Sequence, residues 1–452
     1  MKLNIYCGQH ELCSLFPFET FEFSPFNHHI GTILFRDGTK VEFELHAAGF
    51  IQDVVSEVKE KQNTVTFEDF TKHPKLNIFN PEPNSLIIFD RWYIERHFVF
   101  MKNYLGINWL NKLFDIWKQR NVRVLFNFAF YESLVYETYL YDFITFNFPF
   151  KHLKLTDYPL FKDKKDFKFD KFYNLFHYIG DNLKHLWYEG DTMRDRIKFT
   201  PVGEIRNKIP RKSHTIKKDY LFQLLQMKPR PHRVYLIEKL IKTNLKDCGI
   251  ITLNKEEYTQ YYNMKKDNIK VTDNNWNQNE FFYSYESDFL KNDWEFLKDE
   301  IIIDTMSEGI HESHTYMYNR RLEFDRSYID IYGETHILYN TMFPTFTEKG
   351  TQPILFEKMF ILYGANEFYK CFEKIGGYTF LDELMLPKDY ITIKDPYKQA
   401  DLIIESLGKL SKVDFSKIFI ESKDKILNNK KIMLEYYDKI ISETYNFILD
   451  NE

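Results

Sequence analysis

A hydroxyl, a carboxylate and an amine follow one another at Thr347, Glu348 and Lys349. The amphipathic stretch that they open predicts a helix over Glu348–Met359, with Thr347 as its N-cap. The first turn of a helix offers N–H groups and the positive end of the helix dipole, and both favour an anion. Lys349 adds a mobile cation suited to a pyrophosphate, and Glu348 can accept hydrogen bonds from two ribose hydroxyls. An ordinary capped surface helix explains the same residues.

Two further polar groups precede this helix in the sequence. Glu334 and Thr335 come directly after Ser327–Gly333, whose first six residues, SYIDIY, predict a buried strand. Further upstream, Arg230 and Arg233 lead into a predicted helix, and a guanidinium can hold a phosphate through two hydrogen bonds. Each group also has a plainer interpretation, a turn in the first case and a solvated basic loop in the second.

These groups lie in a half of the chain that predicts alternating strands and helices. A helix is expected over Val234–Leu245, a strand over Ile250–Leu253, and a strand over Phe360–Tyr363 that ends at Gly364. The carboxyl ends of parallel strands form the edge at which α/β sheets bind ligands, so the polar groups are expected at that edge. Residues 395–410 and 414–449 predict a helical C-terminus.

The N-terminal half also predicts an α/β arrangement. Ser85–Asp90 and Val122–Phe128 have the pattern of buried strands, and between them Tyr93–Arg120 has apolar residues at near-helical spacing. Strand, helix and strand joined in this way form a βαβ unit. Gly31–Leu45 has two alternating runs around Asp37-Gly38 and predicts a β-hairpin. Thr200–Lys218 is basic, contains two prolines and lacks apolar periodicity, which is typical of a linker.

Composition limits the class of protein. The chain has 452 residues, 44% of them apolar, and a formal charge of −5, which favours a globular protein of two domains and disfavours a general nucleic-acid binder. The start of the sequence lacks a continuous apolar signal segment, and no run reaches the length of a membrane span. Four scattered cysteines fit a reducing compartment, so a cytoplasmic protein is expected. Cys7, His10 and Cys13 have no matching second pair for a metal site.

Several nucleotide and hydrolase motifs are missing from the sequence. It contains no G-x-G-x-x-G fingerprint, no P-loop and no G-x-S-x-G elbow. It also contains no D-x-D string, which disfavours the metal-dependent single-domain glycosyltransferases. A helix N-terminus, a lysine and an arginine can stabilise a departing diphosphate without a metal ion.

Taken in order, Arg233, Glu334, Thr347-Glu348-Lys349 and the segment Phe360–Gly364 resemble the donor-binding half of fucosyltransferase-like glycosyltransferases of the GT-B type. The resemblance covers about 150 residues of the C-terminal half. Only the T-E-K helix with the strand and glycine that follow it is fairly specific. The chain departs from the family at Gly350, where a bulkier residue is usual, and its N-terminal half has no motif that matches.

The resemblance implies a role for each matching residue. Lys349 would contact the phosphates of a nucleotide-sugar, Glu348 the ribose, and Arg233 the departing diphosphate, with Arg230 as the competing assignment. Glu334 and its neighbour Thr335 would line the donor site. The implied enzyme is a hexosyl- or fucosyltransferase that requires no cofactor, uses no metal and inverts the anomeric centre.

The implied fold is α/β, with two Rossmann-like domains facing across a cleft and a helical C-terminus. The expected boundaries are an N-terminal acceptor domain over residues 1–205, a linker over 206–218, a nucleotide-sugar domain over 219–394 and C-terminal helices over 395–452. A general base for the acceptor hydroxyl, on a glycan or another molecule, is expected in the N-terminal domain. The candidates are Asp90, Glu95 and Glu132.

Two alternatives stay open at this point. The chain could be a non-catalytic binding or structural protein, for instance a virus-encoded one, that retains the fold, because fold does not guarantee function. A weaker alternative is sugar transfer to modified DNA, with the basic residues of Thr200–Lys218 and Arg230–Arg233 as the contact; the net negative charge disfavours it.

Overall fold

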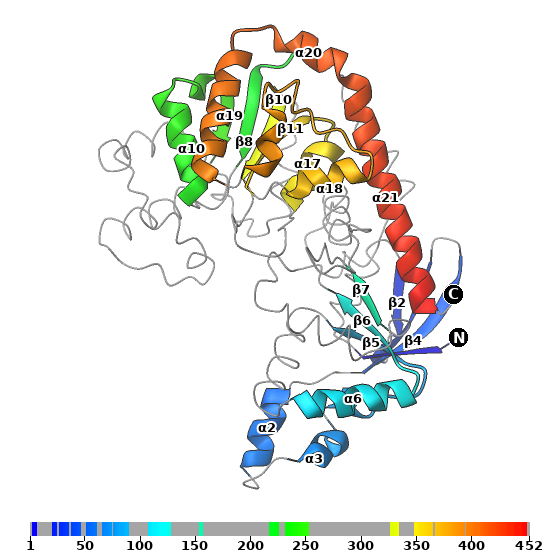
Figure 1. The fold of residues 1–452 in the computed structure, drawn as a ribbon. Coiled ribbons are helices and arrows are strands. Elements are labelled where there is room, and N and C mark those ends of the chain that lie inside the picture. The colour runs from blue at the N-terminus through cyan, green and yellow to red at the C-terminus, as the bar shows by residue number, and fades with distance from the viewer. Residues whose placement is uncertain are drawn as a thin grey trace. The chain divides into compact units, whose positions relative to one another are not determined.

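The computed structural model describes residues 2–6, 20–24, 27–35, 38–46, 51–60, 66–74, 76–89, 107–127, 153–156, 217–225, 231–252, 326–333, 348–364, 367–393 and 395–449. The chain divides into two compact units, residues 1–209 with 439–452 and residues 210–438. Each of the two sheets contains parallel strands, and helices connect several of them, so the fold is α/β (Figure 1).

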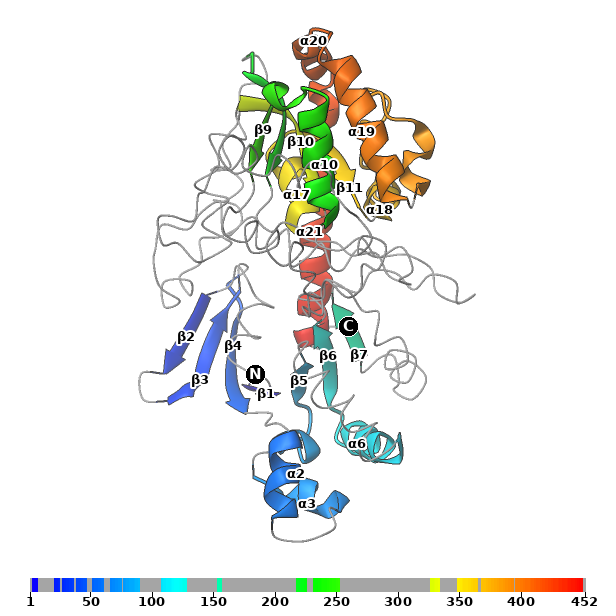
Figure 2. The ribbon, with the colours of Figure 1, turned by 90° about the vertical axis from the view of Figure 1, so that its left-hand side faces the viewer.

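The first sheet belongs to the N-terminal unit and has the order β2-β3-β4-β1-β5-β6-β7 (Figure 2). Its central strand β1 pairs in parallel with β4 on one side and with β5 on the other, and β6 and β7 continue the parallel part. The strands are β1 (Lys2–Tyr6), β2 (Thr20–Ser24), β3 (Asn27–Leu34), β4 (Lys40–His46), β5 (Leu86–Phe89), β6 (Arg123–Asn127) and β7 (Leu153–Thr156); the helices are α2 (Ile51–Lys59), α3 (Phe67–Lys72) and α6 (Ile107–Gln119), with a 3-10 turn at Asn77–Phe79.

Two predictions for this unit are confirmed. Strands β3 and β4 form an antiparallel hairpin around Gly38, whose φ of 88° lies in the left-handed region that glycine adopts readily. Strands β5 and β6 pair in parallel with α6 between them, which is the predicted βαβ unit. Helix α6 buries Leu113 and Trp117, and the Trp117 indole donates to the Ile78 carbonyl at 2.7 Å. The part of the predicted amphipathic stretch before Ile107 lies outside the described residues.

The second sheet belongs to the C-terminal unit and has four strands, all parallel, in the order β11-β10-β8-β9. The strands are β8 (Tyr220–Leu225), β9 (Gly249–Thr252), β10 (Ser327–Gly333) and β11 (Met359–Tyr363); the helices are α10 (Pro231–Lys242), α17 (Glu348–Leu355), α18 (Glu367–Lys374), α19 (Pro396–Leu410) and α20 (Phe415–Glu421), with 3-10 turns at Lys246–Cys248 and Lys388–Thr392. The last helix, α21 (Lys423–Leu449), belongs to this unit up to Asp438. All residues of β10 and β11 are buried, as expected for parallel strands covered on both faces.

Helices cover the two faces of this sheet. Successive side chains of a strand point to opposite faces. Tyr332 and Phe360 lie on the face that packs against α17 and α18, since the Phe360 ring contacts Phe368 at 6.2 Å between centroids. Tyr363 lies on the other face, where its ring contacts His232 of α10. Helices α10 and α19 lie side by side on that second face (Figures 1 and 2).

The expected helix Glu348–Met359 is too long. In the structure α17 ends at Leu355, and β11 already begins at Met359. The helix is closed by backbone hydrogen bonds from Lys358 to Pro353 and from Glu357 to Ile354, which form a Schellman motif. Glu357 occupies its left-handed position with a φ of 58°. Glycine or asparagine is usual there, so the sequence gives little sign that the helix stops.

Strand β11 lies at the edge of the sheet, and side chains satisfy its outer backbone groups. The Leu362 N–H donates to the Tyr369 hydroxyl at 2.8 Å, and the Leu362 carbonyl accepts from the Tyr390 hydroxyl at 2.7 Å. Both tyrosines are buried. Unpaired groups on an edge strand invite pairing with another chain, so these contacts protect the edge and fix the strand in place.

The predicted helical C-terminus is resolved into three helices. Asp395 caps α19 through the N–H groups of Tyr397 and Lys398, and Asp414 caps α20 through the N–H of Ser416. The stretch expected as one helix over 414–449 is interrupted at Ser422, after which α21 begins.

Candidate functional site

The carboxyl edge of the four-stranded sheet contains a change of direction in the strand order. From β8 the chain passes to β9 on one side, and β10 then pairs with β8 on the other side. In open α/β sheets ligands bind outside the carboxyl ends of strands at such a switch point. Here the point lies between the ends of β8 and β10, at Leu225 and Gly333.

Arg233 reaches this point from the first turn of α10. Its Nη2 donates to the carbonyl oxygen of Gly333 at 2.8 Å, and the residue is 3% exposed. The preceding residue, His232, is fully buried and places its ring 5.6 Å from that of Tyr363, the last residue of β11. The start of α10 therefore contacts the carboxyl ends of two neighbouring strands.

Gln399 makes the corresponding contact at the end of β11. Its Oε1 accepts from the N–H of Gly364 at 3.2 Å, and its Nε2 donates to the Gly364 carbonyl at 3.1 Å. The same Nε2 donates to the Ile393 carbonyl at 2.6 Å. Gln399 is in the first turn of α19 and is fully buried. The Gln399 side chain thus satisfies both backbone groups of Gly364, as a neighbouring strand would do.

Helix α17 begins beside the same strand ends. Glu348 and Lys349 are its first two residues, and Gly350 is the third. A Cβ atom at Gly350 would lie 3.1 Å from the ring of Phe368 and 3.4 Å from the Tyr332 hydroxyl. The glycine therefore allows the first turn of α17 to pack closely against the side chains of Phe368 and Tyr332, the second of which belongs to β10. This gives a packing reason for the departure at Gly350 from the resembled family.

Of the predicted donor residues, the structure brings Arg233 to the strand ends and places Glu348 and Lys349 at the start of α17. Arg230, Glu334, Thr335 and Thr347 lie outside the described residues. In the sequence, Arg230 directly precedes α10, Glu334 directly follows β10, and Thr347 directly precedes α17. Their assignments stay predictions.

The predicted base candidates Asp90, Glu95 and Glu132 also lie outside the described residues, and Asp90 directly follows β5. Sequence reasoning missed a histidine at an equivalent position. His46 ends β4, which pairs in parallel with β1, and its ring stacks on that of Tyr6 at 4.7 Å. Its Nε2 lies 3.3 Å from Asn4 Oδ1. In the sequence His46 is only a polar residue at the end of an apolar alternating run. The parallel pairing of β4 with β1 shows that this end lies at the carboxyl edge of parallel strands, where a ligand could bind.

A buried polar network lies nearer the amino ends of the same strands. Lys358 Nζ donates to Ser327 Oγ at 2.5 Å and lies 3.4 Å from Gln223 Oε1, which accepts from Ser327 Oγ at 2.9 Å. Asp330 pairs in register with Gln223. Burial raises the pKa of Asp330 to about 6, although the Lys358 charge and a hydrogen bond from Gln223 act to lower it. No pattern in the sequence indicates that these residues lie together.

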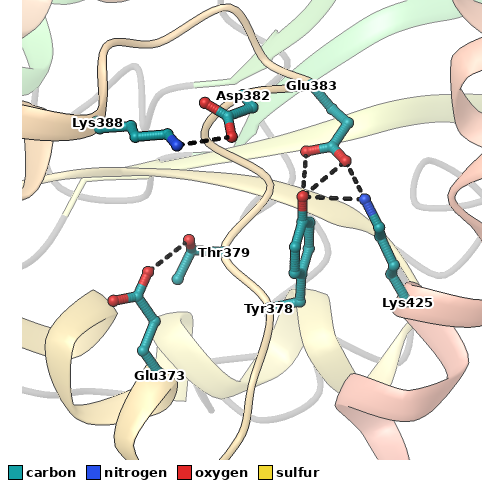
Figure 3. A network of polar contacts seen from close by, with 7 residues as sticks. All are labelled: Glu373, Tyr378, Thr379, Asp382, Glu383, Lys388 and Lys425. Carbon is teal, nitrogen blue, oxygen red and sulfur yellow. Dashed lines mark hydrogen bonds and ion pairs between the residues drawn. The ribbon is translucent and has the colours of Figure 1, made fainter.

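A second polar network attaches α21 to the segment after α18 (Figure 3). The Tyr378 hydroxyl contacts Glu383 at 2.8 Å and accepts from Lys425 at 2.9 Å, and Lys425 also pairs with Glu383. Burial acts to raise the pKa of Glu383, but its hydrogen bonds with Lys425 and Tyr378 prevail and hold that pKa below the usual value. Asn429 binds both backbone groups of Tyr378 at 2.7 Å. These contacts explain the attachment of the helix and require no ligand.

Two tests for other kinds of site are negative among the described residues. There, no three His, Cys, Asp or Glu side chains lie close enough together to hold a metal ion. Within the same parts of the chain, none of the helices, α21 included, is long and apolar enough to cross a membrane.

Comparison of the chain with models of protein families, with curated proteins and with solved structures finds no match.

Proposed function

We propose that this chain is a glycosyltransferase with two Rossmann-like domains, whose C-terminal domain binds a nucleotide-sugar. The observation that carries the proposal is the switch point of the four-stranded parallel sheet. Helices α10 and α17 both begin at its carboxyl edge; in the sequence Arg230 directly precedes α10, and Glu348 and Lys349 open α17. Two helix N-termini with nearby cations suit a diphosphate.

The chemistry follows from charge. As the bond between the anomeric carbon and the diphosphate oxygen breaks, the bonding electron pair leaves with the diphosphate. Lys349 and an arginine at the start of α10 would stabilise this developing charge, together with the helix N–H groups, without a metal ion. Glu348 would hold the ribose and keep the anomeric carbon in register with the acceptor.

The acceptor oxygen forms the new bond to the anomeric carbon and loses its proton to a general base. A single displacement of this kind inverts the anomeric centre. Asp90, Glu95 and Glu132 remain the predicted bases, and His46 joins them because it ends a parallel strand of the N-terminal sheet. The acceptor is a hydroxyl group on a glycan or another molecule.

Turnover tests the proposal. The whole chain is incubated with a panel of UDP-, GDP- and dTDP-sugars, and release of free nucleoside diphosphate is followed by chromatography, with and without pooled glycan acceptors. We expect release from one donor class in the presence of acceptor, because transfer of the sugar to the acceptor oxygen frees the diphosphate. Binding of a nucleotide-sugar without any release would instead favour the non-catalytic alternative. Salt-dependent binding to duplex DNA would favour a nucleic-acid acceptor.

A further inference from the structure

Two neighbouring strands of the C-terminal sheet end at a glycine that a buried side chain holds. Gly333 at the end of β10 accepts from Arg233 at 2.8 Å, and Gly364 after β11 exchanges two hydrogen bonds with Gln399. Both side chains come from the first turn of a helix, and both residues are at most 3% exposed. The same geometric solution therefore occurs at two adjacent strand ends.

The two helices that supply these side chains are fastened to each other. The rings of Tyr235 in α10 and Tyr397 in α19 meet edge to face at 4.8 Å, and Lys239 Nζ pairs with Asp401 at 2.7 Å. The two helices pack against each other. A shift of either helix would therefore be transmitted to the other and to both strand ends.

We propose that Arg233 and Gln399 are positioning residues, and that α10 and α19 act as one clamp on the carboxyl ends of β10 and β11. The inference rests on the proposed function, in that the carboxyl ends of β10 and β11 would border the donor site. Arg233 then sets the shape of the donor site and does not contact the diphosphate. The contact with the diphosphate is then left to Lys349 and Arg230, the other two cations that the sequence predicts for this site.

Gln399 supports this assignment for Arg233. The Gln399 amide carries no charge and cannot neutralise a phosphate. It nevertheless binds the backbone of Gly364 at the end of β11, just as Arg233 binds the backbone of Gly333 at the end of β10. The hydrogen bond from Nη2 to the Gly333 carbonyl ties the guanidinium to the end of β10. Contact with a phosphate would require the guanidinium to be presented to the ligand, whereas Arg233 is 3% exposed.

The first test needs no ligand. Hydrogen exchange of backbone amides is followed by mass spectrometry in the peptides that cover β10 and β11, for the whole chain and for Arg233→Met, Arg233→Lys and Gln399→Leu. Loss of the clamp hydrogen bonds is expected to speed exchange at the strand ends about tenfold in the methionine and leucine variants. Arg233→Lys, which keeps a donor, should recover part of the protection at β10.

Asp401→Asn is the matched control. It weakens the exposed ion pair between the same two helices but touches neither strand end. Exposed pairs contribute little, so exchange at β10 and β11 is expected to stay unchanged. Unchanged exchange in both Arg233→Met and Gln399→Leu would overturn the clamp, and this result is independent of whether any nucleotide binds.

The second test separates positioning from phosphate contact. Affinities for GDP and guanosine, and for UDP and uridine, are measured by calorimetry. If Arg233 and Gln399 position the site, Arg233→Met and Gln399→Leu lower the affinity for a nucleoside and its diphosphate by the same factor. Arg230→Ala lowers the affinity for the diphosphate alone. Selective loss of diphosphate affinity in Arg233→Met would overturn the assignment of Arg233. If the unaltered chain binds none of the four probes, the proposed function is wrong for guanine and uracil nucleotides. The hydrogen-exchange experiment then tests the clamp on its own.

Discussion

At the scale of single residues, the proposed function depends on polar side chains at the ends of parallel strands. Arg233 and Gln399 are occupied with backbone groups of Gly333 and Gly364. Lys349 and Glu348 are placed only as the first residues of α17. His46 adds a titratable group at the carboxyl end of a strand in the N-terminal sheet. In the reaction that we propose, donor binding and proton removal belong to different units of the chain.

His46→Ala tests the base at this scale. If His46 removes the acceptor proton, the variant should transfer sugar about 100-fold more slowly while its affinity for a nucleoside diphosphate stays within about twofold. Transfer is measured by chromatography and affinity by calorimetry. The control is His29→Ala, which changes an exposed histidine of β3 in the same sheet. Equal rates in the two variants would show that His46 is not the general base, and Asp90, Glu95 and Glu132 would remain the candidates.

At the scale of elements, the α17–β11 connection shows what could be predicted from local pattern and what could not. The buried strands SYIDIY and FILY were predictable because short runs rich in isoleucine and aromatic residues favour buried strands. The end of α17 was not, because Glu357 takes a left-handed position that favours glycine. The contacts of Arg233 and Gln399 join residues 100 and 35 positions apart, and no local pattern reveals such pairs.

Gly350→Ala tests the close approach of α17. Alanine favours a helix by about 1 kcal/mol over glycine, but its Cβ would press on Phe368, which is packed among Phe360 and Phe372. The two effects oppose each other, so we expect a change within about 1 kcal/mol in the free energy of unfolding. Affinity for a nucleoside diphosphate should fall, because the first turn of α17 must move away from Tyr332.

The double variant Gly350→Ala with Phe368→Leu is the companion measurement. The smaller side chain makes room for the new Cβ, so nucleotide affinity should recover relative to Gly350→Ala, even though loss of the aromatic packing lowers stability. If affinity is unaffected in the single variant, the position of the first turn does not matter for the ligand.

Lys430→Met tests how the turn after α17 is held. Lys430 Nζ of α21 pairs with Glu357 at 2.5 Å, with the two side chains 13% and 5% exposed. Removing one partner of a buried pair leaves a buried charge, so we expect a loss of about 3 kcal/mol in the free energy of unfolding, measured by denaturant titration. The double variant Glu357→Gly with Lys430→Met should lose less, because glycine relieves the left-handed backbone. A larger loss in the double variant would contradict this.

At the scale of the whole molecule, the chain forms two compact α/β units, each with one sheet that contains parallel strands. The α/β class was predictable because strand and helix patterns alternate along the chain. The pairing of β1 with both β4 and β5 was not, because β1 is separated from β5 by about eighty residues. The buried network around Asp330 was equally hidden, since one carboxylate within SYIDIY could also face solvent.

Asp330 gives a prediction for global stability. Burial raises its pKa in the folded chain to about 6, so between pH 4 and pH 6 the folded state holds a proton that the unfolded state has released. The free energy of unfolding should therefore fall as the pH rises through this range, by on the order of 1–3 kcal/mol from this group. Other carboxylates titrate in the same range, so the comparison is with Asp330→Asn.

The measurement for Asp330 is denaturant unfolding at a series of pH values. As the pH rises from 4 to 6, the free energy of unfolding of the unaltered chain should fall relative to that of Asp330→Asn. The partners Lys358 and Gln223 are unchanged in both chains. A difference that stays constant across this range would show that Asp330 keeps its usual pKa in the fold.

Binding of a nucleoside diphosphate by the C-terminal unit is the central claim, and calorimetric titration of the whole chain tests it most directly. UDP, GDP and dTDP are titrated into the unaltered chain and into Lys349→Ala. We predict that one diphosphate binds the unaltered chain, and that affinity falls about tenfold or more in the variant because a charge-assisted contact is lost. Binding that is undiminished in Lys349→Ala would contradict the assignment of that residue, and the absence of binding by all three diphosphates would contradict the claim itself.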